Sequence, residues 1–206
     1  MFITFEGSEG SGKTSQIPSL VEFLTQAGYP VVVTREPGGT PIGDQVREIL
    51  SAFKNTAMLP RTEVLLFQAS RAQLVDEVIR PCLASGGVVL CDRYADSTLA
   101  YQGYGYQLEL GPLRQVIDFA TGGLKPDLTL LLDMDVEEGL RRRANSGSLN
   151  RLDELGLAFY QRVRLGYFQL AQDEPHRWVV IDAGRPPEQV QEDIRRVILE
   201  RLKATV

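Results

Sequence analysis

The chain has 206 residues, 43% of them hydrophobic, which is enough apolar material for the core of one domain. Its formal net charge is −5 and its pI is about 5.1, whereas proteins that bind polymeric nucleic acid usually carry a basic surplus. The composition therefore argues against a binder of DNA or RNA. No apolar run approaches the ~20 residues that a membrane-spanning helix needs.

The cysteine and histidine content and the first residues of the chain exclude further classes of protein. Two cysteines and one histidine occur, so a disulfide framework is not expected and a multi-histidine metal site is ruled out. Residues 1–6 run straight into an apolar segment with no basic region and no cleavage site, which is not the pattern of a signal peptide. We expect a cytoplasmic protein without a membrane partner.

Five short apolar runs alternate along the chain with longer helical patterns. The predicted strands are residues 2–6, 31–34, 88–92, 128–133 and 178–182. Each is nearly continuous in apolar character, which favours strands buried on both faces of a parallel sheet. The predicted helices, which supply the crossovers that parallel strands require, are residues 13–27, 42–52, 61–85, 111–120, 136–143, 152–172 and 187–203. This order predicts one α/β domain over residues 1–206, with a parallel sheet covered by helices on both faces.

A polar segment at about residues 141–151 interrupts this pattern. It combines small polar residues with four arginines. Small polar residues suit a loop, and arginines suit an anion, although a solvated basic loop is the alternative. We therefore predict a short lid over an anionic ligand.

The segment between the first strand and the first helix matches the phosphate-binding P-loop pattern at every specified position. Glycines let the backbone wrap around a phosphate and aim its N–H groups inward, and the helix N-terminus adds partial positive charge. Lys13 is expected to reach the β- and γ-phosphates of ATP, and Thr14 to hold Mg²⁺. The alternative is a plain glycine-rich turn from strand to helix. The predicted nucleotide-binding segment is Gly7-Ser8-Glu9-Gly10-Ser11-Gly12-Lys13-Thr14.

A second carboxylate, Asp92, ends the third predicted strand. In open α/β sheets, ligands bind beyond the carboxyl ends of the strands. Asp92 is therefore expected at the same edge as the P-loop, where it could hold Mg²⁺ directly or through water; a plain strand-terminating aspartate is the alternative. Switch GTPases and several kinase classes share the P-loop. Because no asparagine is followed by lysine, the guanine-reading Asn-Lys-x-Asp motif is absent.

Three further segments, taken with the P-loop, resemble the bacterial kind of the thymidylate kinase family. The resemblance runs from Phe2 to the C-terminal helix, and its most specific part begins at Asp92. It implies a five-stranded parallel sheet, phosphate transfer from ATP to dTMP with Mg²⁺, donor and acceptor sites that meet at the P-loop, and usually a homodimer. A kinase of the same fold with another small acceptor and a nucleotide-binding regulator are the alternatives. The segments are Thr34-Arg35-Glu36-Pro37-Gly38-Gly39, Leu66-Phe67-Gln68-Ala69-Ser70-Arg71 and Asp92-Arg93-Tyr94-Ala95-Asp96-Ser97-Thr98-Leu99-Ala100-Tyr101-Gln102-Gly103.

The residues that are candidates for binding the acceptor phosphate follow the ends of the predicted strands. Arg93 stands at the mouth of the sheet, where a guanidinium can bind a phosphate through two hydrogen bonds. The resemblance assigns it to the dTMP phosphate, and a surface arginine paired with an acid is the alternative. By the same resemblance, Glu9 orients the substrate and its magnesium-bound water near the sugar. Arg35 is expected to face the phosphates too, and the other predicted contacts of the following turn and helix are Glu36, Pro37 and Arg47.

Candidates for the acceptor base and sugar come from two of the quoted segments. Phe67 and Arg71 are four residues apart on a predicted helix and so share a face. The resemblance places thymine there, stacked on Phe67 with its O4 accepting from Arg71, although periodicity alone favours a core phenylalanine. Thr98 and Gln102 are predicted as further polar partners of the base. Tyr101 is interpreted as a wall below the deoxyribose that disfavours a 2′-hydroxyl, or alternatively as a packing tyrosine.

Phosphoryl transfer needs positive charge near the moving group. One branch of the family supplies it from a P-loop arginine, but this chain has Gly10 there. The resemblance therefore implies the other branch, which uses a lid arginine. The candidates are Arg151 first, followed by Arg143 or Arg142.

The lid is also where the chain departs from the family pattern. An arginine is common near Ser146, and aspartate is commoner than Asn150 before the arginine. At the other end of the donor nucleotide, Ala183 follows the last predicted strand and is predicted to lie beside adenine.

Overall fold

The computed structural model describes residues 1–145 and 151–204. The middle of the predicted lid, with Ser146 and Asn150, lies outside the described residues.

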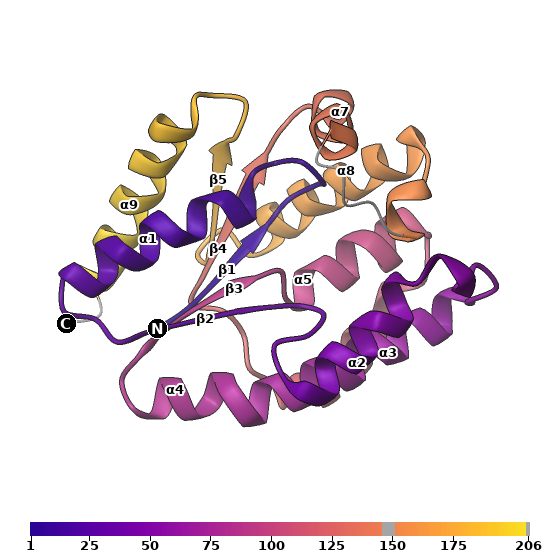
Figure 1. Ribbon diagram of the computed structural model, residues 1–206, viewed down its shortest axis with the longest axis horizontal. Helices are drawn as coiled ribbons and strands as arrows, with labels where there is room; N and C mark the ends of the chain where they lie inside the picture. Colours follow the sequence, from indigo (N-terminus) through magenta and orange to yellow (C-terminus); the bar gives the residue numbers. More distant parts are fainter. Residues whose placement is uncertain (146–150, 205–206) are drawn as a thin grey trace.

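Five parallel strands form one sheet at the centre of the molecule (Figure 1). Their spatial order is β2-β3-β1-β4-β5, which confirms the predicted five-stranded parallel sheet. The strands begin and end at or within one residue of the predicted bounds, because each is an apolar run with buried neighbours on both sides. They are β1 (Phe2–Glu6), β2 (Val31–Arg35), β3 (Val88–Asp92), β4 (Leu128–Asp133) and β5 (Trp178–Asp182).

Helices cover both faces of this sheet (Figure 1). Successive strand residues point to opposite faces. Alternate strand residues such as Ile3 and Leu130 therefore pack with α1 and α9 in one core cluster, while Leu131 and Trp178 pack with α3, α6 and α8 in another. The helical elements are α1 (Lys13–Gln26), α2 (Pro41–Ser51), η1 (Phe53–Asn55), α3 (Pro60–Leu74), η2 (Val75–Ile79), α4 (Arg80–Ala84), α5 (Ala95–Thr98), η3 (Leu99–Gly105), α6 (Leu110–Thr121), α7 (Val136–Asn145), η4 (Arg151–Glu154), α8 (Leu157–Asp173) and α9 (Pro187–Ala204).

Two helical stretches differ from the sequence prediction. The stretch predicted over residues 152–172 begins as the short 3₁₀ turn η4, and α8 starts only at Leu157. The segment over residues 95–105 was not predicted as helical, yet it forms α5 and the π-helical η3. Serine, threonine and glycine make its intrinsic helix propensity low. Packing against α8 stabilises it instead, for example through Arg162, which donates to the carbonyl of Gly105.

The register of the sheet gathers the functional segments at one edge. Phe5 of β1 lies beside Asp92 of β3, and Asp92 lies beside Arg35 of β2. Because all strands are parallel, the P-loop, the turn after β2 and the segment after β3 leave from the same edge. None of the described helices is both long and apolar enough to cross a membrane.

The P-loop touches α7 backbone to backbone. Gly10 has a φ of 73°, and a Cβ on it would collide with the carbonyl oxygen of Gly139. A Cβ on Gly139 would in turn lie 2.5 Å from the carbonyl oxygen of Glu9. A side chain at position 10 therefore has no room, which explains physically why an arginine cannot stand there in this chain.

We predict that Gly139→Ala destabilises the protein although it is a glycine-to-alanine change inside a helix. Such a change normally favours the helix by roughly 0.5–1 kcal/mol, but displacing the P-loop backbone costs about 1–3 kcal/mol. The expected net loss is about 1–2 kcal/mol in urea denaturation, with a raised Michaelis constant for ATP. Gly111→Ala, which meets open space on α6, is the matched control and should be neutral or stabilising; equal behaviour of the two variants would refute the contact.

Candidate active site

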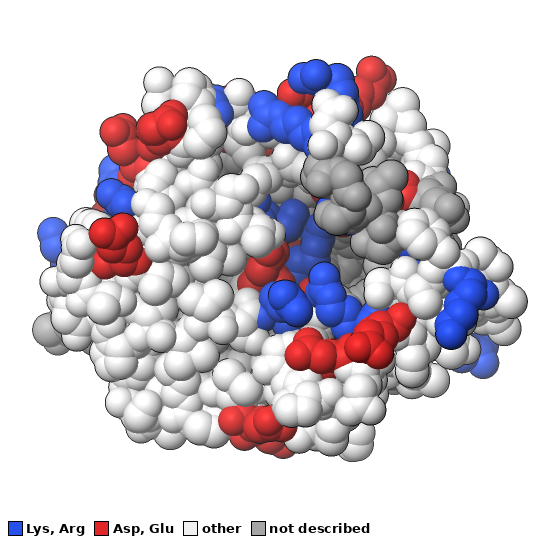
Figure 2. Space-filling view, viewed as in Figure 1, with Lys and Arg blue, Asp and Glu red and all other residues white. Residues whose placement is uncertain are grey.

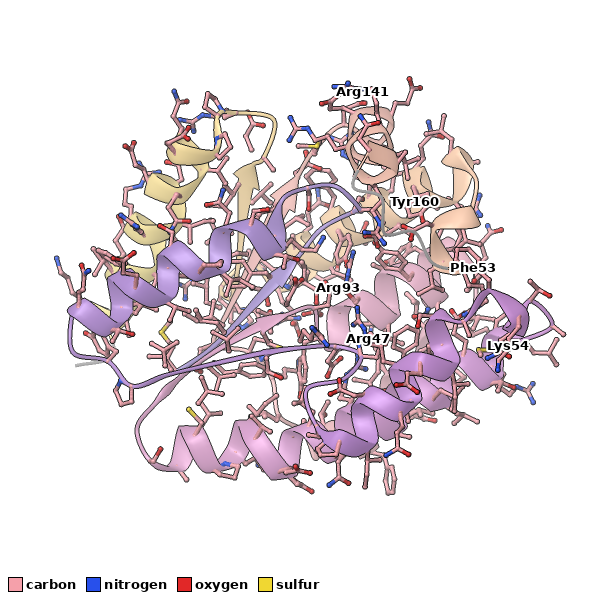
Figure 3. All side chains as sticks on the ribbon, viewed as in Figure 1. Arg47, Phe53, Lys54, Arg93, Arg141 and Tyr160 are labelled. Carbon is pink, nitrogen blue, oxygen red and sulfur yellow. The ribbon has the colours of Figure 1, made fainter. Side chains whose placement is uncertain are left out.

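A pocket of about 660 Å³ opens at the carboxyl edge of the sheet. Figure 2 shows basic side chains gathered in this hollow, and Figure 3 shows Arg93 and Arg47 beside it while Arg141 points away. Most of the predicted site residues lie together in its lining. They are Glu9, Gly10, Ser11, Gly12, Lys13, Thr14, Arg35, Glu36, Pro37, Arg47, Phe67, Arg71, Asp92, Arg93, Thr98, Tyr101, Gln102, Arg143 and Ala183.

Lys13 is held across the P-loop by its ammonium group. Nζ donates to the carbonyl oxygens of Gly7 and Ser8, both at 2.9 Å, and to Oγ of Ser11 at 3.2 Å. Gly7 and Ser8 thus support the site through their carbonyls. Burial, and after it repulsion from Arg93, lowers the pKa of Lys13 from 10.5 to about 8. An incoming anion would reverse part of this shift, because it favours the charged ammonium.

Thr14 and Asp92 form a pair that fits a magnesium ion. Oγ1 of Thr14 donates to Oδ2 of Asp92 at 2.5 Å, at the lip of the pocket. A hydroxyl and one carboxylate suit Mg²⁺, which takes one or two protein oxygens and completes its shell with phosphate and water. Within the part of the chain that the structure describes, no group of three histidine, cysteine or acidic side chains could hold a metal. The third predicted metal residue, Glu9, is engaged elsewhere.

Glu9 is bound by Arg93 and Tyr101. Its Oε1 accepts from Nη2 of Arg93 at 2.8 Å and from the Tyr101 hydroxyl at 3.0 Å. Nη2 of Arg93 also donates to that hydroxyl at 2.9 Å, and the guanidinium lies 4.9 Å from the centre of the Tyr101 ring. Burial by itself would raise the pKa of Glu9, but Arg93 and Lys13 overcome it and lower the pKa. Glu9 is therefore an anion that anchors Arg93.

Three further groups fix the other side of the Arg93 guanidinium. Nη1 donates to the carbonyl of Gly7 at 3.0 Å, to the Tyr167 hydroxyl at 3.2 Å and to the Ser97 hydroxyl at 3.3 Å. Ser97 and Tyr167 in turn donate to Oε2 of Glu6, at 2.6 and 2.7 Å. Glu6 thereby turns the lone pairs of both hydroxyls toward Arg93.

Glu6 is fully buried at the end of β1 and also holds the backbone after Arg93. Its Oε1 accepts from the backbone N–H of Tyr94 at 2.9 Å. Burial, followed by the negative charge of Asp96, raises the pKa of Glu6 from 4.5 to about 7, although Arg93 acts in the opposite direction.

Every N–H group of Arg71 is already used inside the protein. The side chain is 1% exposed. Nε and Nη2 donate to Glu36, Nη2 also donates to the Tyr94 carbonyl, and Nη1 donates to Gln68 at 2.7 Å and to Thr98 at 3.1 Å. Glu36, predicted as a substrate contact, is thus the counter-ion of Arg71. Arg71 lines the pocket without an uncommitted donor for a base.

Thr98 has the free donor that Arg71 lacks. Its Oγ1 accepts from Nη1 of Arg71 and from Nε2 of Gln68 at 3.3 Å. No described group accepts its hydroxyl hydrogen. With both lone pairs occupied, this hydroxyl can only donate, and Thr98 lines the pocket. Phe67, half-buried, lines the same part of it.

The turn after β2 adds two arginines to the pocket. The Glu36–Pro37 peptide bond is cis, and the Pro37 carbonyl accepts from Nη1 of Arg47 at 2.9 Å. Arg35 is more exposed and lies 3.9 Å from Asp44. Both arginines line the pocket.

The predicted lid arginines lie at different places in the structure. Arg143 lines the pocket and pairs with Asp153 at 2.7 Å, and Arg142 also lines it. Arg151 is not among the lining residues. It donates from Nε to the carbonyl of Leu50 at 3.0 Å and from Nη2 to Glu63 at 2.5 Å. Of the three predicted lid arginines, Arg143 and Arg142 therefore line the pocket and Arg151 does not.

Comparisons with known proteins assign the chain to a family. The family described as "Thymidylate kinase" matches residues 5–194. The chain belongs to the thymidylate kinase family. Among its relatives, "Thymidylate kinase" of Thermomicrobium roseum is 54% identical over 98% of this chain and 96% of that protein, and that of Deinococcus radiodurans is 51% identical over 98% and 97%. The crystal structure of thymidylate kinase from Ehrlichia chaffeensis superimposes with a TM-score of 0.78 at 36% identity, covering 97% of this chain and 98% of that one.

Within this thymidylate kinase fold, the residues that sequence reasoning missed are mostly supports. Glu6, Ser97 and Tyr167 hold Arg93, and Glu63 holds Arg151. A charged residue at the end of an apolar strand is the one sequence signal that could have identified Glu6, since such a residue is rarely buried without a partner. The others come from helices whose packing the sequence does not reveal. Further lining residues that were not predicted are Ser15, Gln16, Leu50, Ser51, Leu152, Asp153, Arg185, Pro187 and Val190.

We predict a pH-dependent stability from Glu6. The folded pKa of Glu6, about 7, exceeds the unfolded value of 4.5. The contribution of Glu6 to the free energy of unfolding is therefore complete below pH 4.5 and is lost as the pH rises through 7. Over that window the free energy of unfolding should fall by about 3 kcal/mol. Glu6→Gln removes this titration, so its stability relative to wild type should be about 2–3 kcal/mol better at pH 8 than at pH 5, by urea denaturation.

The matched control for this experiment is Glu48→Gln, at an exposed carboxyl group. Its stability difference from wild type should be the same at both pH values. A Glu6→Gln difference that is equally independent of pH would contradict the buried titration.

Proposed function

We propose that this chain is a thymidylate kinase that transfers the γ-phosphate of ATP to dTMP, giving ADP and dTDP in dTDP biosynthesis. The observation that carries the proposal is the placement of Arg93 between two halves of one pocket. One half is the P-loop with Lys13, which suits the phosphates of ATP. The other half contains Phe67 and Thr98, which suit a pyrimidine base.

In this proposal the protein acts by alignment and charge neutralisation. Lys13 and the P-loop N–H groups bind the β- and γ-phosphates. Arg93, with Arg47 and Arg35 nearby, binds the acceptor phosphate through its positive charge and through Nε, since both Nη atoms already donate to protein groups. Arg93 is preorganised because Glu9, Tyr101, Ser97 and Tyr167 hold it before substrate binds, so little reorganisation is needed. Mg²⁺, held by Thr14 and Asp92, would supply positive charge to the transferred phosphoryl group.

Arg143 and Arg142 are the proposed sources of the remaining charge on the moving phosphoryl group. Both line the pocket at the α7 side of the P-loop, and Arg143 is close enough to Glu9 to lower the pKa of that carboxyl group. Gly10 supports this choice, since α7 leaves no room for a P-loop arginine. Arg151 is proposed to act elsewhere. Ala183, Arg185 and Pro187 line the part of the pocket proposed for adenine.

The acceptor half is proposed to bind thymine through stacking and directed hydrogen bonds. The ring of Phe67 offers a face to the base. The hydroxyl of Thr98, which can only donate, suits the O4 carbonyl of thymine and opposes the amino group of cytosine. Arg71 contributes by holding Thr98 in place. Tyr101 is proposed as the wall under the deoxyribose, with its hydroxyl committed to Arg93 and Glu9.

We also propose a cytoplasmic homodimer. The neighbouring helices α2, α3 and α6 present several large apolar side chains to solvent, and Phe119 of α6 is 90% exposed. Exposed apolar patches of this kind mark protein interfaces. The residues are Ile42, Ile49, Leu65 and Phe119.

The test of the proposed activity is ADP release with Mg²⁺-ATP against dTMP, dUMP, dCMP, dGMP, AMP, UMP and GMP. We expect fast turnover largely confined to dTMP, with dUMP weaker. Lys13→Ala should lower kcat at least 100-fold, because one preorganised positive contact to the transition state is lost. Turnover with a different monophosphate would keep the donor site and discard the base pocket. No turnover in a protein that still binds ATP would favour a nucleotide-binding regulator.

The dimer is tested by light scattering after size exclusion. Wild type should have twice the 22.9 kDa mass of one chain. Phe119→Asp should shift the mass toward a single chain, because a buried unpaired carboxylate opposes association. Leu165→Asp, at an equally large exposed side chain on α8, is the control and should leave the mass unchanged. A monomeric wild type would refute the dimer.

A further inference from the structure

Glu63 is a buried carboxylate just outside the pocket. It lies in the first turn of α3 and is 1% exposed. Its Oε1 accepts from Nε2 of Gln102 at 2.8 Å, and its Oε2 accepts from Nη2 of Arg151 at 2.5 Å. Glu63 therefore joins a residue of the pocket lining to an arginine that lies away from it.

This contact decides which end of the Gln102 carboxamide faces Glu63. A carboxylate only accepts hydrogen bonds, so the amide must turn its Nε2 toward it. The amide oxygen then points to the other side, and no described donor reaches it. Since Gln102 lines the pocket, its Oε1 is the acceptor that the pocket receives.

Arg151 keeps Glu63 in this acceptor role. Its guanidinium forms a buried ion pair with the carboxylate and is itself fixed by the carbonyl of Leu50. A guanidinium can only donate hydrogen bonds, so Oε2 of Glu63 accepts from Arg151 while Oε1 accepts from Gln102.

Gln102 acts beside Thr98, which lies four residues earlier in the same helical segment and lines the same pocket. Thr98 presents a donor and Gln102 presents an acceptor. Thymine offers the complementary pattern, with an acceptor at O4 and an N–H donor at N3. Cytosine offers the reverse pattern, with an amino donor at C4 and an acceptor at N3.

We propose that Glu63 is a specificity-determining positioning residue, which fixes the Gln102 carboxamide so that its oxygen receives the imide N–H of the acceptor base. Arg151 serves this arrangement rather than the transferred phosphate. The inference rests on the proposed thymidylate kinase activity and adds a reason for rejecting cytidine nucleotides. It also explains why the Glu63–Arg151 pair is buried next to the pocket. A carboxylate accepts hydrogen bonds and cannot donate them, so it holds an amide in one orientation.

The experiment compares dTMP and dCMP as acceptors for wild type and Glu63→Gln. The substitution keeps the shape of the side chain but lets the Gln102 amide adopt either orientation. The ratio of kcat/KM for dTMP to that for dCMP should fall at least 10-fold, mainly through a higher KM for dTMP. The KM for ATP should change less than about 2-fold, because Glu63 lies outside the donor half. An unchanged ratio, or equal changes in both Michaelis constants, would overturn the proposal.

A swapped double variant, Glu63→Gln with Gln102→Glu, provides the rescue. It keeps one carboxylate in the pair and places it at position 102, where it can only accept. The preference for dTMP over dCMP should return toward the wild-type ratio. This variant also carries the test if Glu63→Gln alone does not fold, and a double variant without dTMP preference would count against the proposal.

Asp96→Asn is the matched control, because it breaks a similarly buried carboxylate–arginine pair, Asp96 with Arg177, which lies away from the pocket. It should lower the melting temperature without changing the dTMP/dCMP ratio. Wild-type activity separates the two proposals. A wild type that does not phosphorylate dTMP refutes the proposed function, whereas an active, dTMP-selective wild type with an unaltered Glu63→Gln ratio refutes only the role of Glu63.

Discussion

The guanidinium of Arg93 is the interaction on which the arrangement of the pocket depends. It joins the P-loop, through Gly7 and Glu9, to η3 through Tyr101 and to α8 through Tyr167. Arg93 itself has a φ of 69°, a left-handed conformation that costs about 1–2 kcal/mol for a residue with a side chain. Charge-assisted hydrogen bonds to buried partners, each stronger than a neutral one, offset that cost. The donor and acceptor halves are consequently held in a fixed relation.

The pocket is basic although the chain is acidic. Among the described lining residues are eight basic and four acidic side chains, which makes the pocket suited to phosphates while the net charge of the chain is −5. Several of these arginines are paired: Arg93 with Glu9, Arg71 with Glu36, Arg143 with Asp153. The carboxylates fix the guanidiniums in position, and they also limit repulsion between neighbouring positive charges. Such preorganisation is what electrostatic catalysis of phosphoryl transfer requires.

Buried polar groups around the acceptor half also fix which neighbouring side chains donate hydrogen bonds and which accept them. Arg71 with all its donors committed leaves Thr98 as a donor, and Glu63 with Arg151 leaves Gln102 as an acceptor. A buried polar group that is left unpaired costs about 1–3 kcal/mol, so each residue in these networks constrains the next. The proposed reading of the base thus depends on residues that the base does not touch.

The sequence alone was enough to predict the five parallel strands, the P-loop and the edge of the sheet where the pocket lies. These features depend on local patterns: continuous apolar runs, glycine spacing, and the rule that parallel strands end together. The tertiary structure decided which side chains contact one another. Sequence could not show that Glu36 pairs with Arg71, that Glu6 supports Arg93, or that Arg151 binds Glu63 while Arg143 lines the pocket. These contacts join residues 10 to 161 positions apart or depend on the packing of α5 and η3. Helix propensity did not predict that segment, because its helical form depends on contacts with α8.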